Sequence, residues 1–119
     1  MAERNPRVTI EHSDDVIIVE LTDRRILDEM NISEIGAQIQ GLIAETERPK
    51  MVLDFARVAH MSSSALGMLI TLNKRVAEKG GQLRLCNIQE AIYEVFVITR
   101  LNEIFTICPS RPEALDSFE

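Results

Sequence analysis

The chain has 119 residues, of which 45% are hydrophobic and 27% are charged. This length and composition predict one globular domain over residues 1–119, with a buried core and with residues 1–6 as a flexible start. The formal net charge is −6, and the Lys and Arg residues are scattered along the sequence. These features argue against nucleic acid and against an anionic membrane surface as partners, because both require clustered positive charge.

The sequence carries no sign of export or of membrane insertion. Residues 1–6 are polar and of mixed charge, without the apolar segment of a secretory signal. The longest stretch free of Lys, Arg, Asp and Glu, residues 58–73, is shorter than a membrane span. A cytoplasmic location is therefore expected. In that reducing compartment, Cys86 and Cys108 are predicted to be buried free thiols.

The first segment predicts a β-hairpin. Residues 7–11 alternate between apolar and polar side chains, which is typical of an edge strand. Residues 16–21 form a β-branched run typical of a more central strand, and residues 12–15 supply the turn between the two. His12 lies in this turn without a second ligand at metal-binding spacing, so we interpret it as a solvated turn residue.

An amphipathic helix is predicted to follow the hairpin. Asn31 and Glu34 have the spacing of a helix N-cap and its reciprocal partner, so the helix is expected to begin at Asn31. Pro49 cannot continue a helix and marks its end. Apolar residues at steps of three and four give the helix one face that packs on a sheet: Ile32, Ile35, Ile39, Leu42 and Ile43.

Residues 51–55 predict a buried strand, and the helix before it favours a parallel crossover. Asp54 is the one charged residue of this run. We interpret it as a residue at the solvent end of the strand that accepts a hydrogen bond from a neighbouring backbone amide, in preference to a direct chemical role. After a short connection, helical spacing begins at the serines 62–64 and continues until Gly80 and Gly81 stop the second helix.

The last third of the chain repeats the strand and helix alternation. Residues 82–86 predict a strand, Asn87 a helix cap, residues 104–107 a final strand, and residues 111–118 a short closing helix with Pro in its first turn. The third helix is expected to bury one face, composed of Ile88, Ala91, Ile92, Val95 and Phe96. The whole pattern predicts an α/β fold with a mixed, mostly parallel sheet of four to five strands and about four helices.

No catalytic or cofactor motif is recognisable. The glycines form neither a dinucleotide-binding nor a Walker pattern. His60 is the only base near the serines, and it has no identifiable carboxylate to orient it, so a hydrolase is not supported. We therefore expect a protein that is not an enzyme and that holds no cofactor or metal.

Three consecutive serines, Ser62, Ser63 and Ser64, stand where the second helix begins. One of them is sufficient as an N-cap, which accepts a hydrogen bond from a first-turn amide. A neighbouring hydroxyl that points outward could instead be phosphorylated, because free amides and the helix dipole favour a phosphate at this end. The residues alone leave both interpretations open.

The segment Val52-Leu-Asp-Phe55 followed by Met61-Ser-Ser-Ser-Ala-Leu-Gly-Met-Leu69 resembles the STAS domain, most closely the single-domain bacterial anti-sigma factor antagonists. The resemblance covers nearly the whole chain and implies a single STAS-like domain. The family pattern is an apolar-Asp-apolar strand, a short loop and then Asp-Ser-Ser-Gly-Leu-Gly. In that family, an anti-sigma kinase phosphorylates the serine after the Asp, and the unphosphorylated protein binds this kinase and frees a sigma factor.

The resemblance places Ser63 at the phosphoacceptor position, with Ser62 and Ser64 as less favoured acceptors. Two positions depart from the family pattern, because Ser62 replaces the Asp and Ala65 replaces the first Gly. The family's other acidic landmark, before the first helix, falls on Asp28. The implied partner is an anti-sigma factor with serine kinase character, and the implied role is partner switching in the regulation of transcription. The predicted partner-binding residues are Asp28, His60, Met61, Ser62, Ser63, Ser64, Ala65 and Met68.

An alternative is a STAS scaffold that is not phosphorylated and that self-associates as a homo-oligomer or docks on a multidomain sensor. An exposed apolar patch on the helix that begins at Ser62, including Met61, Met68 and Leu69, would favour this interpretation.

Overall fold

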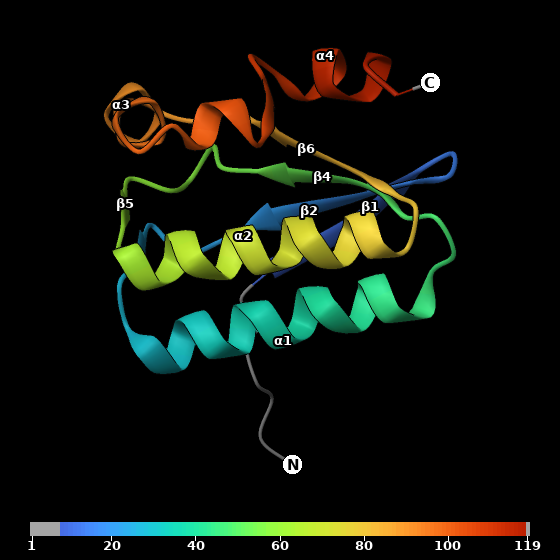
Figure 1. Cartoon of the computed structure of the whole chain (residues 1–119), viewed down its shortest axis with the longest axis horizontal. Coiled ribbons are helices and arrows are strands. Elements are labelled where there is room, and N and C mark those ends of the chain that lie inside the picture. Colours follow the sequence, from blue (N-terminus) through green and yellow to red (C-terminus); the bar gives the residue numbers. More distant parts are fainter. Residues whose placement is uncertain (1–7, 119) are drawn as a thin grey trace.

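The computed structural model describes residues 8–118 and contains a five-stranded sheet with the order β1-β2-β4-β6-β7 (Figure 1). Strand β1 is antiparallel to β2, and every other neighbouring pair is parallel, so the predicted hairpin, edge strand and crossovers are confirmed. The predicted flexible start, residues 1–6, lies outside the described residues. The strands of this sheet are β1 (Val8–Ser13), β2 (Val16–Leu21), β4 (Lys50–Asp54), β6 (Gln82–Cys86) and β7 (Thr106–Cys108).

Two long helices cover one side of this sheet. Figure 1 shows α1 and α2 side by side there, with α4 on the other side of the sheet. The predicted α/β class, with a mixed and mostly parallel sheet and four α-helices, is confirmed. The helices within residues 8–118 are α1 (Glu29–Glu45), α2 (Ser63–Glu78), α3 (Glu90–Ile98), the short 3-10 helix η1 (Leu101–Glu103) and α4 (Arg111–Asp116).

The apolar runs of the sequence bury both faces of the sheet. In β2, Ile17 and Val19 belong to the main core under α1 and α2, whereas Val16 and Ile18 belong to a smaller cluster under α4. Successive side chains of a strand point to opposite faces, so a strand covered on both sides must be almost continuously apolar. Cys86 and Cys108 are buried free thiols in the smaller cluster, as predicted.

Helix α1 begins earlier than the sequence predicts. Asp28 is its N-cap, with one side-chain oxygen accepting a hydrogen bond from the amide of Met30 at 2.8 Å. The prediction that Asn31 caps this helix is therefore wrong, and Asn31 lies inside the first turns. An Asp cap with a further acid, Glu29, in the first turn satisfies the free amides and complements the helix dipole better than the later Asn does.

A small parallel sheet, which the sequence pattern does not reveal, joins the entrances of α1 and α2. It consists of β3 (Arg25–Ile26) and β5 (His60–Met61). The amides of Ala59 and His60 both donate to the carbonyl of Arg24, at 2.8 and 3.2 Å. Strands of two residues have no alternation to detect, which is why this region reads as irregular connections.

The predicted end of α2 is confirmed, and it depends on two glycines with different roles. Gly80 has a φ of 72°, the left-handed conformation that ends helices. At Gly81, an added Cβ would lie 2.1 Å from the carbonyl oxygen of Pro49. The two chain segments that lead into β4 and β6 therefore approach each other more closely than any side chain would allow.

Several boundaries in the hairpin and in the last third differ from prediction. His12 belongs to β1, so the turn consists of Asp14 and Asp15 alone. Asn87 does not cap α3, because Gln89 holds the N-cap position, although its side chain forms no capping bond. On α3 only Ile92 and Phe96 are buried. The expected partners Ala91 and Val95 are exposed, Ile88 precedes the helix, and the last strand begins at Thr106.

Candidate functional site

The three serines at the start of α2 have three different environments. The Ser62 hydroxyl is the N-cap and accepts a hydrogen bond from the amide of Ala65 at 3.2 Å. The Ser64 hydroxyl donates to the carboxylate of Glu29 at 2.7 Å. Ser63 is exposed, and its hydroxyl has no hydrogen-bond partner among residues 8–118. Only Ser63 therefore presents a free hydroxyl at the positive end of this helix.

Glu29 brings a carboxylate to the start of α2 from the neighbouring helix. It is the first residue of α1, and its bond to Ser64 connects the first turns of both helices. Position 62 carries Ser in place of the acid that the motif would have there, so the acid nearest to the serines comes from α1. Sequence reasoning missed Glu29, since its contact spans 35 residues and has no local pattern.

The other predicted partner-binding residues lie around the same two helix starts, with one exception. Asp28 and His60 are exposed, and Met61 and Met68 are partly buried. Ala65 is completely buried in the main core, so it cannot contact a partner directly. The amide of Ser62 donates to the carbonyl of Ile26 at 3.1 Å, which fixes the β5 to α2 junction against β3.

An open groove of about 400 Å³ runs between α1 and α2 from this end of the molecule. Small residues keep the helices close, since an added Cβ at Gly36 would lie 3.2 Å from the Met68 side chain. Glu29 and Ser64 stand at one end of the groove. Its further lining residues are Ile32, Ser33, Gly36, Ala37, Gln40, Gly67, Met68 and Thr71.

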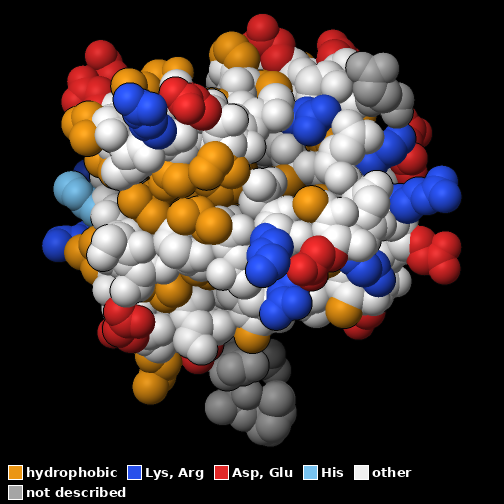
Figure 2. All heavy atoms as spheres, viewed as in Figure 1, with side chains coloured by type: hydrophobic (Ala, Val, Ile, Leu, Met, Phe, Trp, Pro, Cys, Tyr) orange, Lys and Arg blue, Asp and Glu red, His pale blue; other side chains and the backbone are white. Residues whose placement is uncertain are grey.

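The exposed apolar patch of Met61, Met68 and Leu69 that would favour the scaffold alternative is not present. Leu69 is fully buried, and the two methionines pack against the main core. Hydrophobic side chains do gather at the surface, but on the half of the molecule that carries α3, η1 and the first turns of α2 (Figure 2). Amphipathic spacing alone does not indicate which flank of a helix neighbouring elements will cover.

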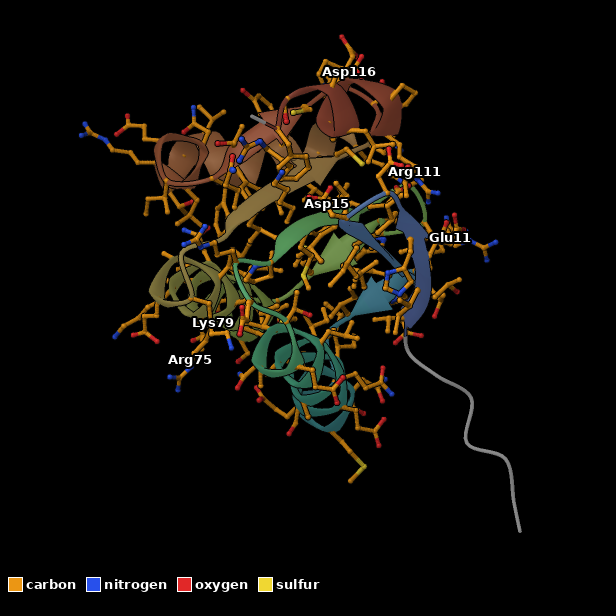
Figure 3. All side chains as sticks on the ribbon, turned by 90° about the vertical axis from the view of Figure 1, so that its right-hand side faces the viewer. Glu11, Asp15, Arg75, Lys79, Arg111 and Asp116 are labelled. Atoms are coloured by element: carbon orange, nitrogen blue, oxygen red, sulfur yellow. The ribbon has the colours of Figure 1, made fainter. Side chains whose placement is uncertain are left out.

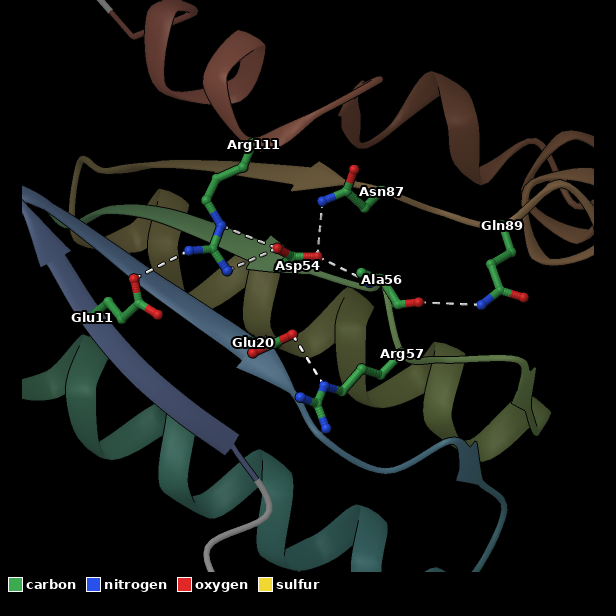
Figure 4. A network of polar contacts seen from close by, with 8 residues as sticks. All are labelled: Glu11, Glu20, Asp54, Ala56, Arg57, Asn87, Gln89 and Arg111. Atoms are coloured by element: carbon green, nitrogen blue, oxygen red, sulfur yellow. Dashed lines mark hydrogen bonds and ion pairs between the residues drawn. The ribbon is translucent and has the colours of Figure 1, made fainter.

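A second polar cluster lies on the α4 side of the sheet, where Arg111 extends toward Glu11 on β1 (Figure 3). Asp54 is at its centre and is only 3% exposed. One Asp54 oxygen accepts from the amide of Ala56 at 2.9 Å and from the side chain of Asn87 at 3.1 Å. The other accepts from Nε and Nη2 of Arg111, at 3.1 and 2.9 Å (Figure 4).

The predicted bond of Asp54 to a neighbouring amide is confirmed, but its predicted place at the solvent end of the strand is wrong, because Asp54 is buried. The ion pair that accompanies this burial was missed, since Arg111 lies 57 residues away. Burial lowers the pKa of Arg111, and the hydrogen bond and charge of Asp54 outweigh this and raise that pKa above its ordinary value. Burial, and then the charge of Asp54, raise the pKa of the Cys86 thiol to about 12. The cluster ties α4 to the end of β4.

Within the described part of the chain, no group of three or more His, Cys, Asp or Glu side chains could hold a metal ion. No helix between residues 8 and 118 is long and apolar enough to cross a membrane. The site at the helix starts thus consists of an exposed hydroxyl, two carboxylates and an open groove.

Comparison with known proteins assigns this arrangement to a family. The STAS domain model matches residues 7–114. The "Putative anti-sigma factor antagonist BtrV" of Bordetella bronchiseptica (strain ATCC BAA-588 / NCTC 13252 / RB50) is 26% identical over 113 residues, covering 95% of each chain. The "Anti-sigma F factor antagonist" of Paenibacillus polymyxa is 25% identical over 115 residues, covering 97% of each.

Solved structures agree on the fold. An anti-sigma-factor antagonist (STAS) domain protein from Planctomyces limnophilus superimposes with a TM-score of 0.82 at 21% identity, covering 92% of this chain and 95% of that one. The phosphorylated form of the Bacillus cell fate determinant SpoIIAA superimposes with a TM-score of 0.70 at 19% identity, covering 92% and 96%.

Proposed function

Because the chain belongs to the STAS domain family, we propose that it acts as an anti-sigma factor antagonist and not as an enzyme. It binds an anti-sigma factor with serine kinase character through the starts of α1 and α2, and phosphorylation of Ser63 weakens the complex. The protein then works in the cytoplasm as a partner-switching regulator of transcription. The names of two curated relatives support the antagonist role, since one is called a putative anti-sigma factor antagonist and the other an anti-sigma F factor antagonist.

The observation that carries this proposal is the different hydrogen bonding of the three serines. Ser62 is occupied as the cap and Ser64 by its bond to Glu29, so a kinase meets one unengaged hydroxyl, that of Ser63. Phosphorylation there disrupts neither of these bonds. SpoIIAA, which shares this fold, has been solved in a phosphorylated and an unphosphorylated form.

The charge around Ser63 explains why a phosphate would act on the partner and not on the fold. The first-turn amides of α2 favour an anion, which offsets part of the repulsion from the nearby carboxylates. A partner that covers Ser63 must remove a group carrying roughly −1.5 to −2 charges from water. The cost therefore falls on binding, and the domain itself stays folded.

The direct test is incubation with the cognate anti-sigma kinase and ATP, followed by mapping of phosphate by mass spectrometry. Phosphate is expected on Ser63 and absent from the Ser63→Ala variant, whereas Ser64→Ala is the matched control that keeps the acceptor. Absence of phosphate from all three serines would eliminate the switch.

Binding provides an independent test of the same surface. Ser63→Asp should weaken capture of the unmodified partner, and Ser63→Ala should leave it unchanged. Equal capture by the two variants would refute the idea that charge at Ser63 controls the complex.

A further inference from the structure

Cys86 and Cys108, the two cysteines of the chain, lie directly opposite each other on neighbouring strands. Strands β6 and β7 are parallel, and their register pairs these two residues, as it pairs Leu85 with Ile107 just before them. Successive side chains of a strand point to opposite faces of the sheet. Leu85 and Ile107 pack in or against the main core, whereas both cysteines belong to the smaller cluster under α4. The two thiols therefore point to the same face.

The spacing of the two residues allows a disulfide bond. Neighbouring strands lie about 4.7–4.9 Å apart, and the Cα atoms of a disulfide are about 4.4–6.8 Å apart. Directly opposite cysteines thus fall within the range for a bond, near its short end. Burial is the main cause of the raised pKa of Cys86, and the charge of Cys108 is among the smaller causes, which agrees with this proximity.

The two thiols differ in their access to solvent. Cys86 is fully buried, whereas Cys108 is 9% exposed. An open hollow of about 230 Å³ reaches Cys108, and its other lining residues are Ile88, Tyr93, Ile107 and Pro109. A molecule as small as a hydroperoxide fits in such a hollow, since a water molecule takes up only about 30 Å³. An oxidant from solvent therefore meets Cys108 first.

We propose that Cys86 and Cys108 form a reversible disulfide when a hydroperoxide oxidises the protein. The sulfur of Cys108 attacks the O–O bond, a sulfenic acid forms, and the leaving oxygen takes up the proton of the Cys108 thiol. The sulfur of Cys86 then attacks the sulfur of that sulfenic acid, the S–O bond breaks, and water leaves with the proton of Cys86. In sum, two thiols are oxidised to one disulfide, and the hydroperoxide is reduced to an alcohol and water.

The position of this bond makes it easy to reverse. A disulfide near the short end of the Cα range is strained, and strain makes the bond easier to reduce. Glutathione in a reducing compartment would therefore open it once the oxidant is consumed.

The bond would tie β7, which leads into α4, to β6, and it would close a loop that contains α3 and η1. It would lie on the opposite side of the sheet from α1 and α2 (Figure 1). The oxidation site is therefore separate from the proposed partner switch, and either proposal can fail without the other.

Mass spectrometry of the reduced full chain after incubation with hydrogen peroxide tests the proposal. The folded wild type is expected to lose the mass of two hydrogen atoms and to remain a single chain. Arg100 separates the two cysteines, so trypsin places them on different peptides. After remaining thiols are blocked with N-ethylmaleimide, these two peptides should be recovered joined to each other. Millimolar reduced glutathione should restore both thiols.

Single substitutions identify the role of each thiol. In Cys86→Ala, oxidation should stop at the sulfenic acid of Cys108, which dimedone traps. In Cys108→Ala, the remaining thiol should stay unmodified over the same time, because solvent does not reach Cys86. Circular dichroism spectra equal to that of the wild type confirm that both variants are folded.

The measurements on the wild type alone can overturn the proposal. Oxidised, folded protein in which the two peptides are not joined would do so. A linkage that forms only in urea would also do so, because the thiols would then meet only in the unfolded chain. A linkage between two chains, or a bond that glutathione does not open, would equally contradict a reversible bond between β6 and β7.

Discussion

Replacing Arg111 by Met tests how much the buried ion pair contributes to stability. The substitution keeps an apolar stem of similar length but removes both hydrogen bonds to the second oxygen of Asp54. The side chain of Asp54 is 4% exposed and that of Arg111 27%, so water cannot fully replace the lost partner. Leaving a buried charge unpaired costs about 3–5 kcal/mol, and the partial exposure of Arg111 places this case near 3 kcal/mol.

The same arginine provides its own control. Nη1 of Arg111 also contacts Glu11 at 3.1 Å, but the side chain of Glu11 is 53% exposed. Breaking this contact with Glu11→Gln should cost about 0.5 kcal/mol, as for other surface pairs. Two contacts of similar length from one guanidinium should thus differ several-fold in their contribution to the free energy of unfolding, because only one of them is buried.

Urea unfolding followed by circular dichroism measures both losses as shifts of the midpoint at constant slope. In thermal unfolding, a loss of 3 kcal/mol should lower the Tm by roughly 12 °C for a domain of this size. The double variant Asp54→Asn with Arg111→Met should cost less than the sum of its two single substitutions, since the residues form one contact. Equal losses for Arg111→Met and Glu11→Gln, or an additive double variant, would refute the assignment of the ion pair as a stabilising clamp.

Three further outcomes follow from local geometry. Ser62→Ala should lower the free energy of unfolding by about 1 kcal/mol through loss of the cap, whereas Ser63→Ala should change it little. Equal effects of the two substitutions in urea titrations would contradict the assignment of Ser62 as the cap. Gly81→Ala should destabilise the fold by about 2 kcal/mol or more, because its Cβ would overlap the Pro49 carbonyl, and a thermal midpoint equal to the wild type would disprove this contact. The folded pKa of Cys86, about 12, lies above its ordinary 9.0, so the thiol contributes stability that is complete below pH 9 and declines as pH rises from 9 toward 12. Urea titrations across this range should show a steeper decline for the wild type than for Cys86→Ala, and parallel declines would exclude the buried thiol as the cause.

The parts of the fold that the sequence predicts are those with a long repeating pattern. The spacing of Ile32, Ile35, Ile39 and Ile43 identifies the buried face of α1, and all four side chains are buried. Gly80 and Gly81 mark the end of α2 because backbone conformation and close approach are local requirements. In such segments, neighbouring residues alone carry enough information to place the element.

The features that the sequence does not predict depend on contacts between distant segments. Asn87 has the composition of a helix cap, yet its φ of 57° and its bond to Asp54 place it in the turn before α3. Glu29 reaches Ser64 only because α1 and α2 lie side by side. Val95 fits the apolar period of α3 but is exposed, since periodicity does not show whether another element covers that flank.

The candidate site likewise has one part that local sequence predicts and another that depends on distant contacts. The family resemblance points to Ser63, but helical capping rules alone do not show which of the three hydroxyls is the cap. Hydrogen bonds of Ser62 and Ser64 distinguish them, and one of these bonds crosses to another helix. Sequence therefore located the region and proposed Ser63, and tertiary contacts show which hydroxyls of that region are already hydrogen-bonded.

The small sheet of β3 and β5 has a dynamic consequence for the proposed docking surface. It contains only two residues from each segment, and it joins the starts of α1 and α2. A sheet with so few backbone hydrogen bonds protects its amides only weakly. We therefore expect the amides of Ala59, His60 and Ser62 to exchange with solvent sooner than those of β2 or β4. A partner that orders this corner on binding loses conformational entropy there, and part of its interaction energy is spent on stiffening the domain.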